Sequence, residues 1–237
     1  MNRPYVTLNA AVSCDGKLAS RTRAKFRFSN DEDAKVIDAM RSDSDAILIG
    51  ATTLAMDNPR LIVHGTENQR LRTKRGKSPQ PAKVTISPDC MVDPQSNFFQ
   101  VGEGNKYVFT TNRAKPEDIA MLESVATVVQ HETERVDILL LLQELYNRGI
   151  RKLLVEGGGS TNFEFIKEKV ADEIRIAIAP MLVGGAGSPT LVDGMGFDPD
   201  NAPNLQLLEV QQLEEIVAIR YKFRDVAGGL DAKNCSK

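Results

Sequence analysis

Three consecutive glycines mark the segment of the chain best suited to hold a ligand. They follow an apolar run at residues 151–155 and lie within the series Glu156, Gly157, Gly158, Gly159, Ser160, Thr161 and Asn162. Because glycine has no Cβ, this backbone can take positive φ angles and lie close against a bound group. One of the three polar residues that follow is expected to cap a helix, whose first N–H groups favour a phosphate. The segment indicates a nucleotide or phosphate site, with a plain strand-to-helix turn as the alternative.

Other polar or glycine-rich segments also follow apolar, strand-like runs. Thr53 and Asp57 come after residues 45–50, Asp15 comes after the first apolar run, and Gly184 and Gly185 come after residues 173–179. Ligands in open α/β sheets bind at the carboxyl ends of the strands, so these segments together could line one crevice. Each of them alone is also ordinary turn chemistry.

Composition and residue usage exclude several other kinds of site. The net charge of −2 over 237 residues gives no overall attraction to nucleic acid or to an anionic membrane. Cys14, Cys90 and Cys235 lie far apart, which indicates neither a disulfide framework nor a zinc site, and we expect no metal. His64 and His131 are also far apart, and no Gly-x-Ser-x-Gly motif is present to support a hydrolase triad. The polar run around His131 predicts a solvated loop.

The elements that must position these residues alternate between strand-like and helical patterns. This alternation predicts an α/β fold with a mostly parallel central sheet flanked by helices. Strands are expected at residues 5–12, 45–50, 83–87, 106–111, 125–129, 151–155 and 173–179, and helices at 30–41, after Pro116 and at 136–148. Two extended runs at 205–210 and 216–223 predict a C-terminal antiparallel hairpin. The basic stretch at 66–82 has little apolar content and is interpreted as a solvated surface loop.

We expect a single domain over residues 1–226 and a frayed tail at 227–237. The chain starts in a strand-like segment rather than a signal peptide, and no apolar run is long enough for a membrane span. A cytoplasmic location is therefore expected.

Taken together, these segments resemble a known family, the reductases of the riboflavin pathway, which have a dihydrofolate-reductase-like fold. The same domain occurs in that family as the C-terminal half of bifunctional deaminase-reductases. The resemblance covers residues 4–223. It rests on the pattern Thr53-x-x-x-Asp57-x-Pro59-x-Leu61, the series Val155-Glu156-Gly157-Gly158-Gly159, Ile178-Ala179-Pro180 followed by Gly184-Gly185, and Asp193-Gly194-Met195-Gly196-Phe197.

The resemblance implies an NADPH-dependent reduction, with NADH also possible, of a ribosylamino-pyrimidine 5′-phosphate to its ribitylamino product. Hydride adds to C1′ of the sugar, which is opened as an imine. The positions that match the cofactor contacts of the family are Ala11, Thr53, Asp57, Gly158, Gly159, Ser160, Thr161 and Asn162. Those that match its substrate contacts are Arg41, Leu61, His64 and Glu156, with Lys25 and Arg27 in a loop that caps the ligands. The family also implies a homodimer.

Within this resemblance, Arg41 and Lys25 could hold the 5′-phosphate by charge-assisted hydrogen bonds. Glu156 could accept hydrogen bonds from the amino-pyrimidine, and Asp57 is the candidate for an electrostatic or proton-handling role. His64 stands where many bacterial members have arginine.

The sequence leaves alternatives open for the substrate and for the class of protein. The His-x-Glu and Pro-Cys-x-x-Cys motifs of a zinc deaminase are absent, so a lone reductase points to the diaminopyrimidinone as substrate. The corresponding uracil, as in the bacterial order of reactions, is the first alternative. Another pterin- or pyrimidine-reducing role and a non-catalytic nucleotide-binding module are the others.

Overall fold

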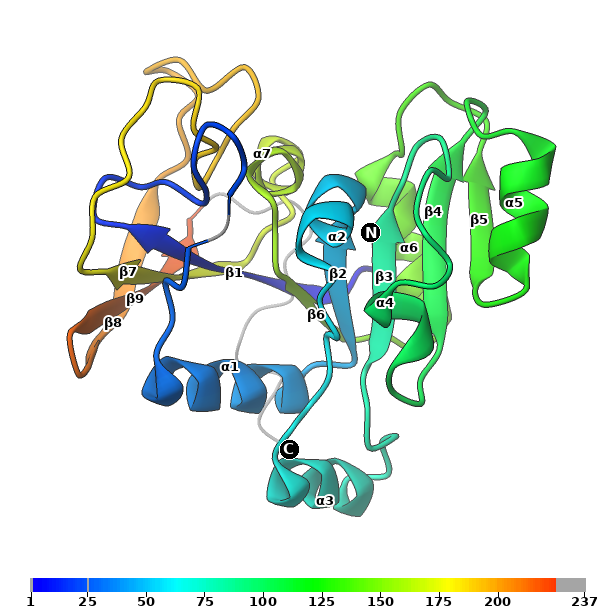
Figure 1. Cartoon of the computed structure of the whole chain (residues 1–237), viewed down its shortest axis with the longest axis horizontal. Coiled ribbons are helices and arrows are strands. Elements are labelled where there is room, and N and C mark those ends of the chain that lie inside the picture. Colours follow the sequence, from blue (N-terminus) through cyan, green and yellow to red (C-terminus); the bar gives the residue numbers. More distant parts are fainter. Residues whose placement is uncertain (1, 25, 225–237) are drawn as a thin grey trace.

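The computed structural model describes residues 2–24 and 26–224, and within them nine strands form one sheet in the order β5-β4-β3-β2-β6-β1-β7-β9-β8 (Figure 1). Neighbours from β5 to β7 are parallel, and β9 is antiparallel to both β7 and β8. The strands are β1 (Tyr5–Ser13), β2 (Ala46–Gly50), β3 (Ala82–Ile86), β4 (Lys106–Thr111), β5 (Thr127–His131), β6 (Lys152–Val155), β7 (Glu173–Ala179), β8 (Leu205–Leu213) and β9 (Ile216–Phe223). The predicted α/β fold with its C-terminal hairpin is confirmed.

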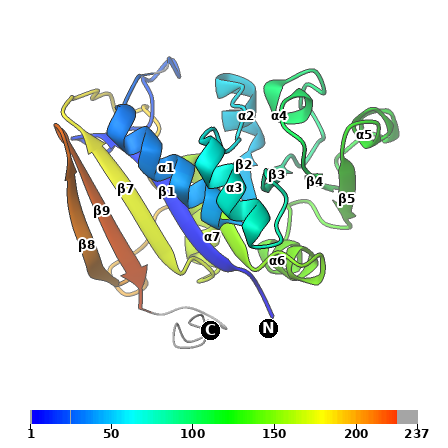
Figure 2. The same cartoon turned by 90° about the horizontal axis from the view of Figure 1, so that it is seen from below.

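Helices cover both faces of this sheet (Figure 2). They are α1 (Asp31–Asp43), α2 (Ala51–Asp57), α3 (Thr66–Lys74), α4 (Asn97–Gln100), α5 (Pro116–Glu123), α6 (Ile138–Asn147) and α7 (Gly159–Lys167). Successive side chains of a strand point to opposite faces, and β2 shows the result. Its Leu48 packs into the core beneath α6 and α7, whereas Ile47 and Ile49 pack with α2, α4 and α5.

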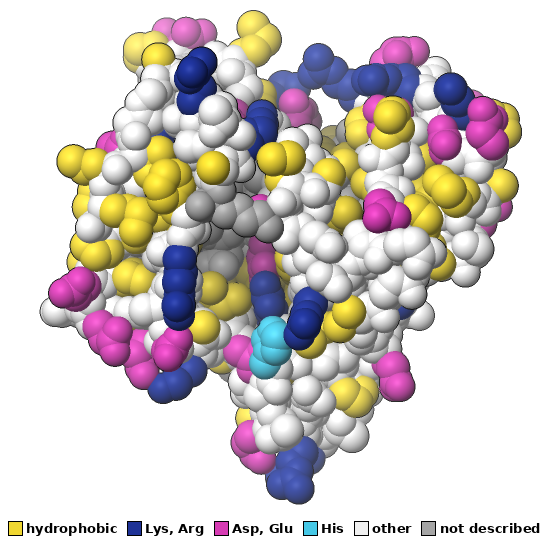
Figure 3. All heavy atoms as spheres, in the orientation of Figure 1, with side chains coloured by type: hydrophobic (Ala, Val, Ile, Leu, Met, Phe, Trp, Pro, Cys, Tyr) yellow, Lys and Arg dark blue, Asp and Glu magenta, His cyan; other side chains and the backbone are white. Residues whose placement is uncertain are grey.

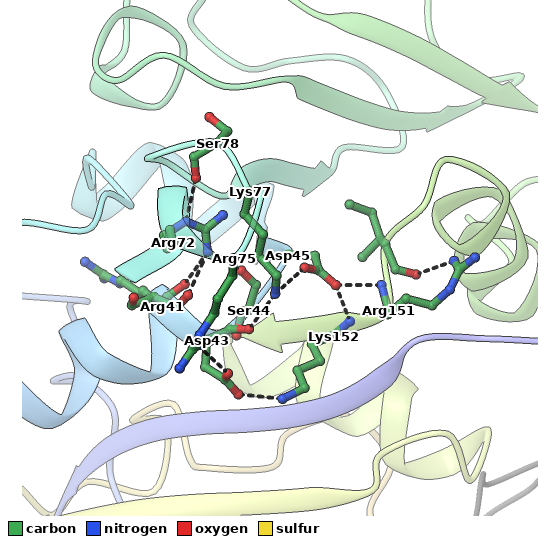
Figure 4. Close-up of polar contacts among 12 residues, drawn as sticks. Arg41, Asp43, Ser44, Asp45, Arg72, Arg75, Lys77, Ser78, Arg151 and Lys152 are labelled. Carbon is green, nitrogen blue, oxygen red and sulfur yellow. Dashed lines mark hydrogen bonds and ion pairs between the residues drawn. The ribbon is translucent and has the colours of Figure 1, made fainter. Parts of the chain in front are cut away.

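Helices α1 and α3 lie side by side below the sheet (Figures 1 and 2). Arg72 of α3 reaches the end of α1, where the last carbonyl groups have no partner inside the helix. Its guanidinium donates to the carbonyl oxygens of Ser42 and Ser44 at 2.9 and 2.5 Å, and to that of Ser78 at 2.8 Å (Figure 4). A positive charge at a helix C-terminus also complements the helix dipole. Arg72 thus fixes the end of α1 against α3.

The prediction of a solvated loop at residues 66–82 is wrong for its first half. Residues 66–74 form α3, and Arg72 is only 2% exposed. The physical reason is that this helix is held in place by the hydrogen bonds of the buried Arg72 guanidinium rather than by an apolar stripe. A pattern search for apolar periodicity therefore gives no signal here.

The prediction for His131 is also wrong. β5 extends two residues beyond its predicted end, so His131 ends the strand and is buried with its ring edge-on to Phe109 at 5.9 Å. Its Nδ1 accepts from the backbone N–H of Asp137 at 3.2 Å, and burial lowers the pKa of the imidazole. The polar residues that follow begin only after this buried position.

The predicted bounds at residues 106–111 and 173–179 coincide with β4 and β7. The predicted tail at 227–237 lies outside the described residues. Over the described ranges, no helix is both long enough and apolar enough to cross a membrane.

Candidate active site

Two segments that lie about a hundred residues apart in the sequence meet at the ends of β2 and β6. These strands are parallel neighbours with Leu48 opposite Val155, so the turns that follow them lie at the same edge of the sheet. A Cβ placed on Gly158 would lie 2.7 Å from Thr53 Oγ1, and one placed on Gly50 would lie 2.5 Å from Thr161 Oγ1. The two chain segments therefore touch, and glycine at both positions permits the approach.

Helix α7 begins two to four residues earlier than a cap at Ser160, Thr161 or Asn162 would require. Gly158 is its N-cap residue, and no side chain caps the helix. The expectation of a hydroxyl or amide cap is wrong, because the three polar residues already lie in the first turn. Instead, the Nδ2 group of Asn162 donates to the carbonyl of Leu191 at 2.9 Å, which ties α7 to the loop beyond β7.

A cavity of about 690 Å³ opens at this edge of the sheet. All of the expected cofactor-contacting residues line it, namely Ala11, Thr53, Asp57, Gly158, Gly159, Ser160, Thr161 and Asn162. Glu156 lines it as well, as do Arg23 and Arg27 of the loop between β1 and α1. Figure 3 shows the hollow in the middle of this face, with basic side chains along its borders.

The other expected substrate-contacting residues do not line this cavity. Leu61 is buried with α2, α4 and α5, and its backbone has φ of +47°. His64 is exposed on the segment between α2 and α3. Arg41 lies behind Glu156 at the end of α1. Lys25 lies outside the described residues.

Glu156 in the cavity wall forms a bidentate ion pair with Arg41 behind it. The Arg41 Nε and Nη2 groups donate to the two carboxylate oxygens at 2.7 and 2.8 Å, and both side chains are less than one-fifth exposed. Burial opposes the charge on Arg41, but attraction to Glu156 outweighs it and raises the pKa of the guanidinium. The pair presents an oriented carboxylate to the cavity.

Asn9 contributes a second fixed polar group that sequence reasoning missed. It lines the cavity from β1, and its Oδ1 accepts from Arg175 Nη1 at 3.2 Å. Arg175 is held in turn by buried Asp33 of α1 at 2.5 Å. The amide is therefore oriented with its Nδ2 donor as the remaining polar atom. One signal was available in the sequence, because Asn9 interrupts an otherwise largely apolar strand.

The fold and the site together define a class of protein. A parallel sheet with a ligand-sized cavity at the carboxyl ends of its strands, walled by glycines and hydroxyl groups, is the arrangement of an α/β enzyme that binds a nucleotide.

Comparison with known proteins gives the family. The RibD C-terminal domain family matches residues 4–219. A 2,5-diamino-6-ribosylamino-4(3H)-pyrimidinone 5′-phosphate reductase of Archaeoglobus fulgidus is 36% identical over 221 residues, which cover 93% of this chain and 99% of that protein. The riboflavin biosynthesis protein RibD of Bacillus amyloliquefaciens is 33% identical over 217 residues, which cover 89% of this chain and 55% of that protein.

Solved structures agree on the fold. A pyrimidine reductase-like protein of Corynebacterium diphtheriae superposes with a TM-score of 0.81 at 22% identity, covering 93% of this chain and 92% of that one. The riboflavin biosynthesis reductase Rib7 of Saccharomyces cerevisiae gives 0.70 at 19% identity, covering 93% and 90%. The chain belongs to the RibD C-terminal domain family, and it is a reductase of riboflavin biosynthesis.

Proposed function

We propose that the protein reduces 2,5-diamino-6-ribosylamino-4(3H)-pyrimidinone 5′-phosphate to its ribitylamino product, with NADPH as the hydride donor. The observation that carries this proposal is the contact of the Thr53 segment with Gly158 in one cavity wall, next to the ion-paired Glu156. The match to the Archaeoglobus fulgidus reductase over nearly the whole chain supports the choice of the diaminopyrimidinone over the uracil.

The residues at the glycine turn fit a nicotinamide dinucleotide. Thr53, Gly158 and the first turn of α7 would hold it, because a side chain at Gly158 would fill the space beside the Thr53 hydroxyl. The uncapped start of α7 suits a phosphate group. When bound, NADPH supplies the hydride that this reaction requires.

The polar groups of the cavity fit the pyrimidine. Glu156 would accept hydrogen bonds from ring amino or N–H groups, and the fixed Asn9 amide would donate to a ring carbonyl. We propose that Arg41 acts chiefly by orienting Glu156, because two of its donor groups are already occupied there. The imine nitrogen takes up a proton as C1′ receives hydride, and Asp57 on the cavity wall remains the candidate for handling it.

The test is NADPH oxidation measured separately with the diaminopyrimidinone and the uracil ribosylamine phosphates. We expect turnover with the first, and a fall in kcat/KM of about a hundredfold in Glu156→Gln, because a charge-assisted contact is lost. Glu132→Gln removes an exposed carboxylate and is the matched control. Turnover with the uracil alone would reverse the substrate assignment, and no turnover with either would favour a binding module.

We also propose a homodimer. Support comes from apolar side chains on the C-terminal hairpin, where Leu207 is 53% and Val210 59% exposed at the edge of the sheet. An exposed apolar patch on an edge strand is a typical surface for association with a second chain. Sedimentation of the wild type should give a dimer that Val210→Lys dissociates, whereas Leu140→Lys on α6, 47% exposed, should leave it intact. A monomeric wild type would overturn this assignment.

A further inference from the structure

The segment between β1 and α1 carries an aromatic ring that the protein leaves uncovered at the cavity. Phe26 lines the cavity and is 41% exposed. It is the sole exposed phenylalanine or tyrosine in the described ranges 2–24 and 26–224, where the others are buried or half-buried. An exposed apolar side chain that lines a cavity is typical of a place where a ligand completes the packing.

The ring of Phe26 is supported by a second aromatic side chain. The centroids of the Phe26 and Phe28 rings lie 5.5 Å apart with an interplanar angle of 26°, which is a stacked arrangement. Phe28 itself is only 7% exposed. It therefore covers one side of the Phe26 ring, and the exposed part of that ring is available to another planar group.

Hydrogen bonds fix the segment on both sides of this ring. Before Phe26, the Ser20 hydroxyl accepts from the backbone N–H of Ala24 at 2.9 Å. After it, Asn30 caps α1, and its Nδ2 group donates to the carbonyl of Leu213 at 2.9 Å. A ring that is already held in place loses little conformational freedom when a ligand binds to it.

This ring reaches the cavity from the side on which the polar groups for a pyrimidine are held. Its segment runs directly into α1, and Figure 1 shows α1 and α7 on opposite sides of β1 and β6. Glu156 is paired with Arg41 of α1. Asn9 is held by Arg175, which pairs with Asp33 of the same helix. The glycine turn, by contrast, leads into α7.

We propose that Phe26 is a stacking platform for the pyrimidine ring of the substrate. This inference rests on the proposed function, which puts the pyrimidine next to Glu156 and Asn9. A planar heterocycle presents its π face to an aromatic side chain, whereas its amino and carbonyl groups lie at its edge. The platform therefore binds the face of the ring, and the carboxylate and amide bind its edge.

The first test is steady-state kinetics of three substitutions at this position. Phe26→Ala should raise the substrate KM about tenfold, while kcat and the NADPH KM change by less than about twofold. Phe26→Leu keeps an apolar side chain without a ring and should raise the substrate KM nearly as much. Phe26→Tyr keeps the ring and should stay within about twofold of the wild type.

Met121→Ala is the matched control, because Met121 is an apolar side chain of α5 that is 44% exposed and outside the lining of the cavity. It should leave every kinetic constant unchanged. An unchanged substrate KM in Phe26→Ala, a wild-type KM in Phe26→Leu, or a larger rise in the NADPH KM than in the substrate KM would overturn the proposal.

A binding measurement separates failure of the platform from failure of the proposed function. The chain contains no tryptophan, so Phe26→Trp introduces a single indole at the platform. Titration with the diaminopyrimidinone ribosylamine phosphate should quench its fluorescence, whereas ribose 5-phosphate, which has no ring to stack, should not. Met121→Trp, with its indole outside the cavity, should respond to neither compound.

Absence of quenching by the pyrimidine, or stronger quenching by NADP⁺ than by the pyrimidine, would overturn the assignment of Phe26. If the wild type turns over neither pyrimidine, the proposed function fails, and quenching of Phe26→Trp by the pyrimidine phosphate alone would still support the platform.

Discussion

Replacing Arg72 with methionine should destabilise the protein strongly. Methionine keeps much of the aliphatic stem but removes the donors to the carbonyl oxygens of Arg41, Ser42, Ser44 and Ser78. Each buried acceptor left without a partner costs about 1–3 kcal/mol. Against this, the variant no longer buries a guanidinium, a burial that lowers the pKa of Arg72 in the wild type. We therefore expect a net loss in the free energy of unfolding of about 3–4 kcal/mol.

Urea unfolding followed by circular dichroism measures this loss as a lower midpoint at constant m value. Arg70→Met on the same helix is the control, because Arg70 is 78% exposed and reaches Glu67 only at 3.9 Å. The control should change stability by less than about 0.5 kcal/mol. A loss below about 1 kcal/mol in Arg72→Met, or equal losses in the two variants, would refute the role given to the buried guanidinium.

Two further predictions concern a buried lysine and a packed glycine. Burial lowers the pKa of Lys83 to about 8, below its value in the unfolded chain, so the folded state releases this proton first and stability should rise as pH increases above 8. Urea unfolding at about pH 7.5 and 9.5 should show a gain of about 1–2 kcal/mol that Lys83→Met abolishes. A Cβ on Gly159 would collide with the Thr190 carbonyl oxygen, so Gly159→Ala should lose about 2–3 kcal/mol and weaken NADPH binding in a fluorescence titration. Gly187→Ala, which meets only ordinary contacts, should change neither quantity.

The parallel strands of this protein were predictable because the sequence of a buried parallel strand is a short, nearly continuous run of apolar residues. β4 and β7 coincide with their predicted bounds. Helix α6 was also found, since it combines an apolar stripe with Asp137 as a cap and Gly149 at φ of +87° beyond its end. In each case the signal is local, and the residues that determine the element lie inside it or directly beside its ends.

The basic stretch that escaped prediction as a helix is held by distant polar partners. Helix α3 owes its position to Arg72 and to Asp38 on α1, and neither residue forms a pattern with its sequence neighbours. The same limit applies at the site. Thr53 and Gly158 were singled out by local motifs and the family resemblance, whereas Asn9 matters only through contacts across the fold. A single sequence gives the types of these side chains but not the groups they meet.

The strand order has a consequence for how the protein is made. Among the described strands, β1 pairs only with β6 and β7, which leave the ribosome after residue 152, whereas β2 to β5 are joined as they emerge. An unpaired apolar strand is exposed to aggregation until its neighbours arrive. Nascent chains stalled before β6 should therefore leave Tyr5–Ser13 open to protease. Strand β1 is therefore translated before β2 to β5 but pairs with its neighbours only after them.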